Sequence, residues 1–161
     1  MFVPWNQMPE HARLWNYTAS RLLGEDEVAA LAEACQQFCN DWAAHGSPLT
    51  ASFQIEHACI LRFAVDESNH AASGCSIDSS VKLVKEWEEN LNVTFFNRLL
   101  SVPVLGSETR PMELEELKSA YQGGQIEEET AMVNTSAAQI LQLLHAPTLP
   151  LHRWWAYPRI K

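Results

Sequence analysis

Apolar and polar positions alternate in several segments of the first two thirds of the chain, and this period of two predicts strands. The first segment covers residues 13–19, and the next two, about 51–57 and 59–65, follow each other closely enough to form a hairpin. The second hairpin segment is largely apolar on both faces, which is typical of a strand inside a sheet. A last segment at 100–104 contains Pro103, which confines a strand to an edge or a bulge.

Apolar residues three and four positions apart predict two amphipathic helices between these strands. One stripe runs from Val28 to Trp42 after a run of acidic residues that favour a helix start, and the other runs from Ile77 to Leu91. The order of elements over about 13–105 is therefore β-α-β-β-α-β. This order predicts an α+β protein with a ferredoxin-like, two-layer core, and another two-layer sheet with the same element order is the alternative.

Residues 106–161 are expected to elaborate this core, and helical patterns such as the one at 113–121 make the C-terminal elaboration largely helical. The tail carries Trp154 and Trp155, whose rings are costly to leave in water. We therefore expect the tail to pack on the domain or on a partner. Packing on a second copy would make the protein a homo-oligomer through these two side chains.

The composition limits the classes to which the protein can belong. With 161 residues, of which 47% are hydrophobic and 19% charged, the chain is expected to form one domain with a full core, 1–161. Eleven basic and twenty acidic residues give a net charge of −9, so we expect no nucleic-acid and no membrane partner. The N-terminus lacks the features of a signal peptide, and no apolar run is long enough to span a bilayer.

The four cysteines have spacings unlike those of zinc sites or of redox sites. A domain with a full core does not need disulfide bonds, so these residues are expected to be reduced thiols in a cytoplasmic protein. Cys35, Cys39 and Cys59 fall on apolar faces and are expected to be buried. We expect no metal and no cofactor.

The segment from Asp66 to Ser80 is the strongest candidate for a functional site, because it joins an apolar strand to a helix. Its candidate ligand-binding residues are Asp66, Glu67, Ser73, Gly74, Cys75, Ser76 and Ser79. Free N–H groups at the start of a helix bind anions, although the Asp78 carboxylate would compete for the helix dipole. This interpretation predicts a non-catalytic binding or interaction module with a small-molecule ligand.

The alternative function is that of a Cys75-dependent thiol enzyme. A cysteine near a helix N-terminus has a lowered pKa, which favours the nucleophilic thiolate. His70 would then act as the base, and Asp78 or Asp66 would orient the imidazole ring.

A third interpretation assigns this segment a structural role only. Ser76 or Asp78 would cap the helix, Gly74 would permit a turn, and Cys75 would pack inward. The acidic and histidine residues of the segment match no metal-ligand spacing, so a metal site is not expected here.

Several motifs also carry a resemblance to a known family. They are Phe2-Val3-Pro4-Trp5, Trp15, Asp66-Glu67-Ser68, and Ser73-Gly74-Cys75-Ser76-Ile77-Asp78-Ser79-Ser80. On these motifs most of the chain resembles a family of small uncharacterised bacterial proteins, which are often labelled ABC transporter ATPases. The resemblance implies no particular catalytic residues.

The residues of this chain contradict an ATPase function. A phosphate-binding loop requires the pattern G-x-x-x-x-G-K-[ST], and none of the six glycines is followed by lysine. The segment 121–125 is similar to part of the ABC signature, but it is also typical of a helix closed by glycine. We therefore expect no ATP hydrolysis.

Overall fold

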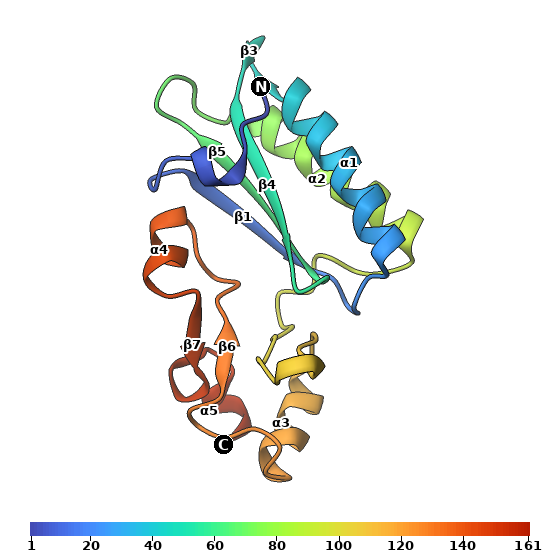
Figure 1. Ribbon diagram of the computed structural model, residues 1–161, viewed down its shortest axis with the longest axis vertical. Helices are drawn as coiled ribbons and strands as arrows, with labels where there is room; N and C mark the ends of the chain where they lie inside the picture. The colour runs from blue at the N-terminus through green and yellow to red at the C-terminus, as the bar shows by residue number, and fades with distance from the viewer.

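The computed structural model describes residues 1–161, and Figure 1 shows the order of its elements along the chain. The first half contains β1 (Arg13–Thr18), α1 (Glu25–Asp41), β2 (Ala43–Ala44), β3 (Ser47–Pro48), β4 (Thr50–Glu56), β5 (Ile60–Asp66) and α2 (Gly74–Leu91). The second half contains α3 (Leu114–Gln122), β6 (Ala131–Val133), α4 (Ile140–His145), β7 (Thr148–Pro150) and α5 (Tyr157–Ile160). Three short 3-10 turns complete the set: η1 (Trp5–Gln7), η2 (Gly106–Glu108) and η3 (Leu151–Arg153).

The main sheet has three antiparallel strands in the order β1-β5-β4. Trp15, Phe63 and Phe53 lie opposite one another across it and share one face. Helices α1 and α2 lie together on one side of this sheet (Figure 1). The predicted hairpin and the predicted central strand are therefore confirmed as β4 and β5.

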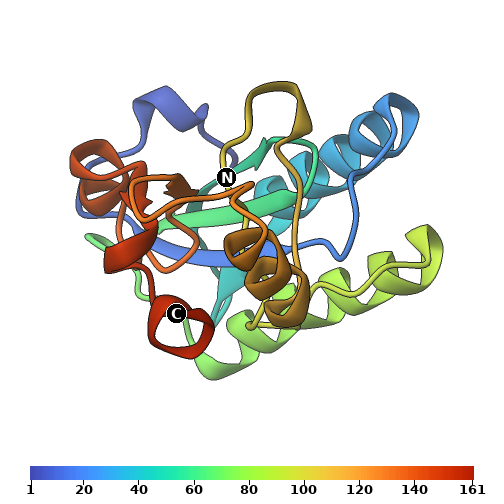
Figure 2. The same cartoon turned by 90° about the horizontal axis from the view of Figure 1, so that it is seen from below.

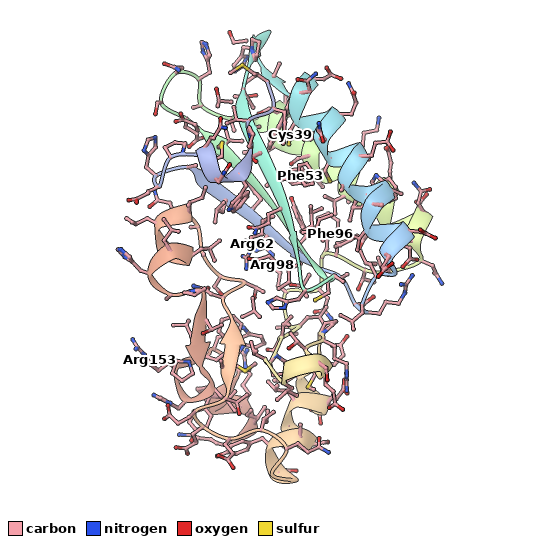
Figure 3. The ribbon with its side chains drawn as sticks, in the orientation of Figure 1. Cys39, Phe53, Arg62, Phe96, Arg98 and Arg153 are labelled. Atoms are coloured by element: carbon pink, nitrogen blue, oxygen red, sulfur yellow. The ribbon has the colours of Figure 1, made fainter.

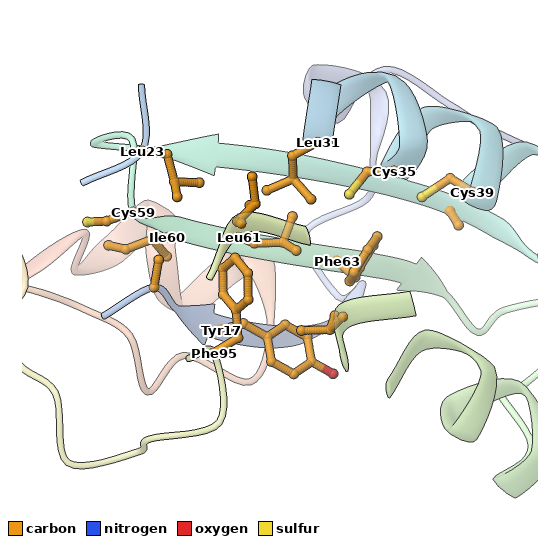
Figure 4. Close-up of a cluster of buried hydrophobic side chains, with 14 of the residues drawn as sticks. Tyr17, Leu23, Leu31, Cys35, Cys39, Cys59, Ile60, Leu61, Phe63 and Phe95 are labelled. Carbon is orange, nitrogen blue, oxygen red and sulfur yellow. The ribbon is translucent and has the colours of Figure 1, made fainter. Parts of the chain in front are cut away.

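The main hydrophobic core lies between this face of the sheet and the two helices, and it contains 21 buried residues. Leu31 and Cys35 of α1 lie over Leu61 and Phe63 of β5 (Figure 4). Each fully buried side chain of this size contributes about 1.5–3 kcal/mol through removal of apolar surface from water. The apolar stripe that predicted α1 therefore marks the face that the helix buries.

The opposite face of the sheet is also covered, by the N-terminal turn and α4. Leu14 and Ala64 pack there against Met8, Ala137 and Ile140. Figure 2 shows α4 and η1 together, away from α1 and α2. Because both faces of β5 are covered, nearly all of its residues are buried.

A buried arginine links this second face to the C-terminal segment. The Arg62 side chain is 1% exposed, and its Nε and Nη2 atoms lie 2.8 Å from Oε2 of Glu56. Its Nη1 donates to Oδ1 of Asn16 at 2.5 Å, and Nδ2 of Asn16 donates to the carbonyl of Ala137 at 2.6 Å. The three strands are thus joined to the segment before α4 by one continuous set of polar contacts.

The C-terminal part has a hydrophobic cluster of its own, with nine buried residues. Trp154 is 2% exposed within it, and its indole N–H donates to the Ser101 hydroxyl at 2.9 Å. The aromatic tail therefore packs against the same chain. A homo-oligomer through Trp154 and Trp155 stays a prediction.

The α+β class is confirmed, but the ferredoxin-like order is not. The segment 100–104, expected to be the fourth strand, pairs in the C-terminal part. Val102 accepts from the Val133 N–H at 2.9 Å, and the Val104 N–H donates to Ala131 at 2.8 Å. Alternation in the sequence indicates that a segment is extended, but it does not choose the partner of that segment. None of the helices combines the length and the apolar composition that crossing a membrane requires.

We predict that Glu56→Gln lowers the free energy of unfolding by about 2 kcal/mol. The substitution removes the negative charge beside the buried guanidinium of Arg62, and breaking a buried pair in this way is costly. The value is modest because the Glu56 side chain is 29% exposed, so water reaches it. Urea titration followed by tryptophan fluorescence measures this difference.

The matched control is Glu129→Gln, because the Glu129 side chain is 81% exposed and pairs only with His152. It should change the free energy of unfolding by less than about 0.5 kcal/mol. Equal effects of the two substitutions would contradict the role given to Glu56.

Candidate functional site

The loop between β5 and α2, predicted as the site, is held by hydrogen bonds within the chain. Oδ1 of Asp66 accepts from the Ser68 hydroxyl at 2.6 Å and from the Ser68 N–H at 3.0 Å, and it lies 3.1 Å from Nε2 of His11. These contacts, of which the Ser68 hydroxyl is the strongest, hold the pKa of Asp66 below its usual value. Glu67 accepts from the Ala72 N–H at 3.0 Å. Both carboxylates therefore already have partners that order the loop.

The serines at the start of α2 cap the helix. Oγ of Ser73 accepts from the Ser76 N–H at 3.2 Å, and Oγ of Ser76 accepts from the Ser73 N–H at 2.7 Å. This reciprocal pair is a capping box, and it leaves Ser76 only 2% exposed. The Ser79 hydroxyl donates to the Ser76 carbonyl at 2.7 Å. Gly74 has open space where a Cβ would lie and no positive φ, so the turn does not require glycine.

Cys75, His70 and Asp78 are all exposed, and no hydrogen bond joins any two of them. No group of three histidine, cysteine or acidic residues is placed to hold a metal ion. None of the three side chains lines any of the three main cavities. The thiol-enzyme interpretation stays a prediction, and the structural role of the segment explains most of its contacts.

A cavity of about 510 Å³ lies elsewhere, between the outer edge of β1, helix α2 and the C-terminal part. We call it the β1 cavity. It is lined by residues 14–18 of β1, Ile77 and Val81 of α2, residues 95–98, Leu100, residues 135–138 and Trp155. Its volume is in the range of small-ligand sites, and most of its lining side chains are hydrophobic.

Two other hollows fit a ligand less well. One of about 630 Å³ lies on the outer surface of α1 and is lined largely by polar side chains such as Glu33 and Gln37. None of the polar side chains that line this hollow is buried. The other, beside Arg62, has only about 230 Å³, which is below the usual volume of a ligand site.

The edge of β1 is unpaired where it meets the β1 cavity. The Leu14 N–H donates to Ala138 at 2.8 Å, and the Ser20 N–H donates to Thr94 at 3.0 Å, so both ends of this edge are covered. In an antiparallel pair, alternate residues direct their backbone groups away from the partner strand. The N–H and C=O groups of Asn16 and Thr18 therefore point to the same edge as those of Leu14. Neither N–H donates to the segments that flank the cavity.

Arg98 is the only charged residue that lines the β1 cavity. Its guanidinium forms no ion pair, although the chain has a net charge of −9. Burial raises the pKa of the Tyr17 phenol, while Ser80 and the positive charge of Arg98 lower it. Figure 3 places Arg98 at the junction between the sheet and the C-terminal part.

This cavity could not be found from the sequence, because its walls come from five separate stretches of the chain. Ile77 is the only lining residue that lies within the predicted segment 66–80. Arg98 follows a helix in an irregular stretch and carries no motif. The site can be recognised only after the strand order shows that one edge of β1 has no neighbouring strand.

We predict that one cysteine of the four reacts with a maleimide in the folded protein. Cys75 is exposed, whereas Cys35, Cys39 and Cys59 are buried. Burial raises the pKa of Cys39 and of Cys59 to about 12, so few thiolates form there at neutral pH. Mass spectrometry should find one label in buffer and four in guanidinium chloride, and Cys75→Ser should abolish the single label. Labelling of the other three in buffer would contradict their burial.

We also predict that the pKa of Asp66 lies below its usual value and that Ser68→Ala raises this pKa. Because the folded-state pKa is lowered, the contact stabilises the protein above the unfolded-state pKa of about 4 and is lost as the pH falls. Nuclear magnetic resonance titration of the Asp66 carboxyl measures the shift. In His11→Ala, which removes a weaker contribution, the change should be smaller. An unchanged pKa in Ser68→Ala would refute this account of the loop.

Comparison of the chain with protein-family models, with curated proteins and with solved structures finds no match in any of the three. The resemblance to the bacterial family therefore stays a prediction from the sequence motifs. The geometry of the β1 cavity alone identifies the candidate site.

Proposed function

We propose that the protein is a non-catalytic binding module and that its ligand occupies the β1 cavity. The observation that carries this proposal is a cavity of about 510 Å³ with mostly hydrophobic lining residues and an unpaired strand edge on one side. Sites for small ligands combine these two properties, since apolar walls provide affinity and a few polar groups orient the ligand.

The place of the cavity supports the proposal. Val81 belongs to α2, beside the main core, whereas Trp155 belongs to the C-terminal part, and both line the cavity. A ligand between them would contact both parts of the chain. Ligand sites are common at such junctions.

The proposal keeps the predicted class of function but moves the site from the segment 66–80 to the β1 cavity. In a ferredoxin-like core the last strand would lie beside β1, and the cavity takes that position here. The predicted cytoplasmic location belongs to the same proposal, supported by cysteines that form no disulfide.

A test uses the dye 8-anilinonaphthalene-1-sulfonate, an apolar aromatic anion whose fluorescence rises in apolar sites. We expect the native protein to bind the dye and Val81→Trp to lose most of the fluorescence increase, because the indole ring fills the cavity. Lys82→Trp is the matched control, since the neighbouring Lys82 is exposed and does not line the cavity.

Equal dye binding by Val81→Trp and Lys82→Trp would contradict the proposed site. Thermal unfolding of both variants shows whether each is folded at the temperature of the measurement. Cross-peak shifts of Asn16 and Ser136 on titration with the dye give a second readout that needs no substitution.

A further inference from the structure

We propose that the ligand of the β1 cavity is an extended peptide segment that carries a carboxylate. This inference rests on the proposed function and deepens it. The peptide would pair with β1 as a fourth strand, and its carboxylate would contact Arg98.

The unpaired edge of β1 supports a peptide rather than a compact molecule. Asn16 and Thr18 each direct one N–H and one C=O to the cavity, and they are two residues apart. In a β-ladder a strand forms its hydrogen bonds with every second residue of its neighbour, and Asn16 and Thr18 have this spacing. Four hydrogen bonds are available to a short segment before it reaches the covered ends at Leu14 and Ser20.

The walls of the cavity can receive alternate side chains of such a segment. Ile77 and Val81 line the α2 side, and Ala137 lies on the side of the second sheet face. Successive side chains of a strand point to opposite faces, so apolar side chains at every second position would contact Ile77 and Val81. Recognition by strand addition works in this way, with the backbone providing affinity and the pockets providing specificity.

Arg98 is the reason to expect a carboxylate on the peptide. It is a cation without an ion-pair partner, and no carboxylate lines the cavity. A carboxylate placed there gains a charge-assisted hydrogen bond, whereas the net charge of −9 disfavours it over most of the remaining surface. The carboxylate can be the C-terminus of the peptide or the side chain of an aspartate or glutamate, and the experiment distinguishes these sources.

The test measures fluorescence anisotropy with three sets of fluorescein-labelled hexapeptides, each randomised among valine, leucine, isoleucine and threonine at the last four positions. The first set ends in a free carboxylate, the second ends in an amide, and the third ends in an amide but has one internal aspartate. We expect the first or the third set to bind the native protein and the second to bind about tenfold more weakly, because a hydrogen bond to a charged group is worth that factor.

Variants of the protein test each contact separately. Arg98→Gln should weaken binding of the preferred set about tenfold, and Arg98→Lys should restore most of it. Arg153→Gln is the matched control, because Arg153 is also exposed but lies outside the cavity, in the C-terminal part (Figure 3).

Thr18→Pro removes the N–H of Thr18, which points away from β5, so no hydrogen bond to β5 is lost. Proline is tolerated on an edge strand where its nitrogen faces outward. The substitution should weaken binding of all peptide sets alike, including the amide. Where this variant does not fold, hydrogen exchange of the native protein replaces it. The Asn16 and Thr18 amides should exchange rapidly alone and become protected when the preferred peptide set is added.

The outcomes separate this inference from the proposed function. Dye binding that depends on Val81, together with no binding of any peptide set, would overturn the peptide and leave the cavity as a site for a small organic anion. Equal binding of amide and carboxylate sets would overturn the role of Arg98. Protection of Asn16 and Thr18 that rises with protein concentration alone would instead identify a second copy as the occupant.

Discussion

The buried guanidinium of Arg62 requires polar partners, and these partners connect the sheet to the C-terminal segment. Arg62 is buried in the middle strand, and the partners that compensate it come from both neighbouring strands, Glu56 on β4 and Asn16 on β1. Asn16 also donates to Ala137, so the same contacts hold the segment before α4 against the sheet. A buried cation requires such partners, because an uncompensated charge inside a protein is costly. The position of the C-terminal part is therefore linked to the core of the sheet.

The open edge of β1 follows from where the C-terminal part finds its partners. Residues 100–104 pair with Met112 and with β6, so they do not reach β1. Thr94 and Ala138 cover only the two ends of the edge. An unpaired strand edge is usually protected, since it invites pairing with another chain. Here the protection consists of a recess lined by apolar side chains, and this same recess is the candidate site.

The segment between β5 and α2 shows that a rich set of polar residues can serve folding alone. Ser73 and Ser76 close the helix start, while Asp66 with Ser68 and Glu67 with Ala72 order the loop before it. The sequence favours Ser76 or Asp78 as the cap, whereas in the structure Ser73 is the N-cap and Ser76 lies at the third helical position. The many serine and acidic residues of this segment led to a functional interpretation. The side chains named above, however, each have a backbone or side-chain hydrogen-bond partner nearby.

Periodicity within single segments is enough to predict the α+β class, the two long helices, the hairpin and the central position of β5. It also placed Cys35, Cys39 and Cys59 in the interior, since they share an apolar stripe or strand. The partner of residues 100–104 and the position of Arg98 depend on tertiary contacts. Strand pairing and cavities join residues far apart in the chain. No local sequence pattern indicates which distant segment pairs with a given strand edge. The binding site proposed here belongs to that second class of property.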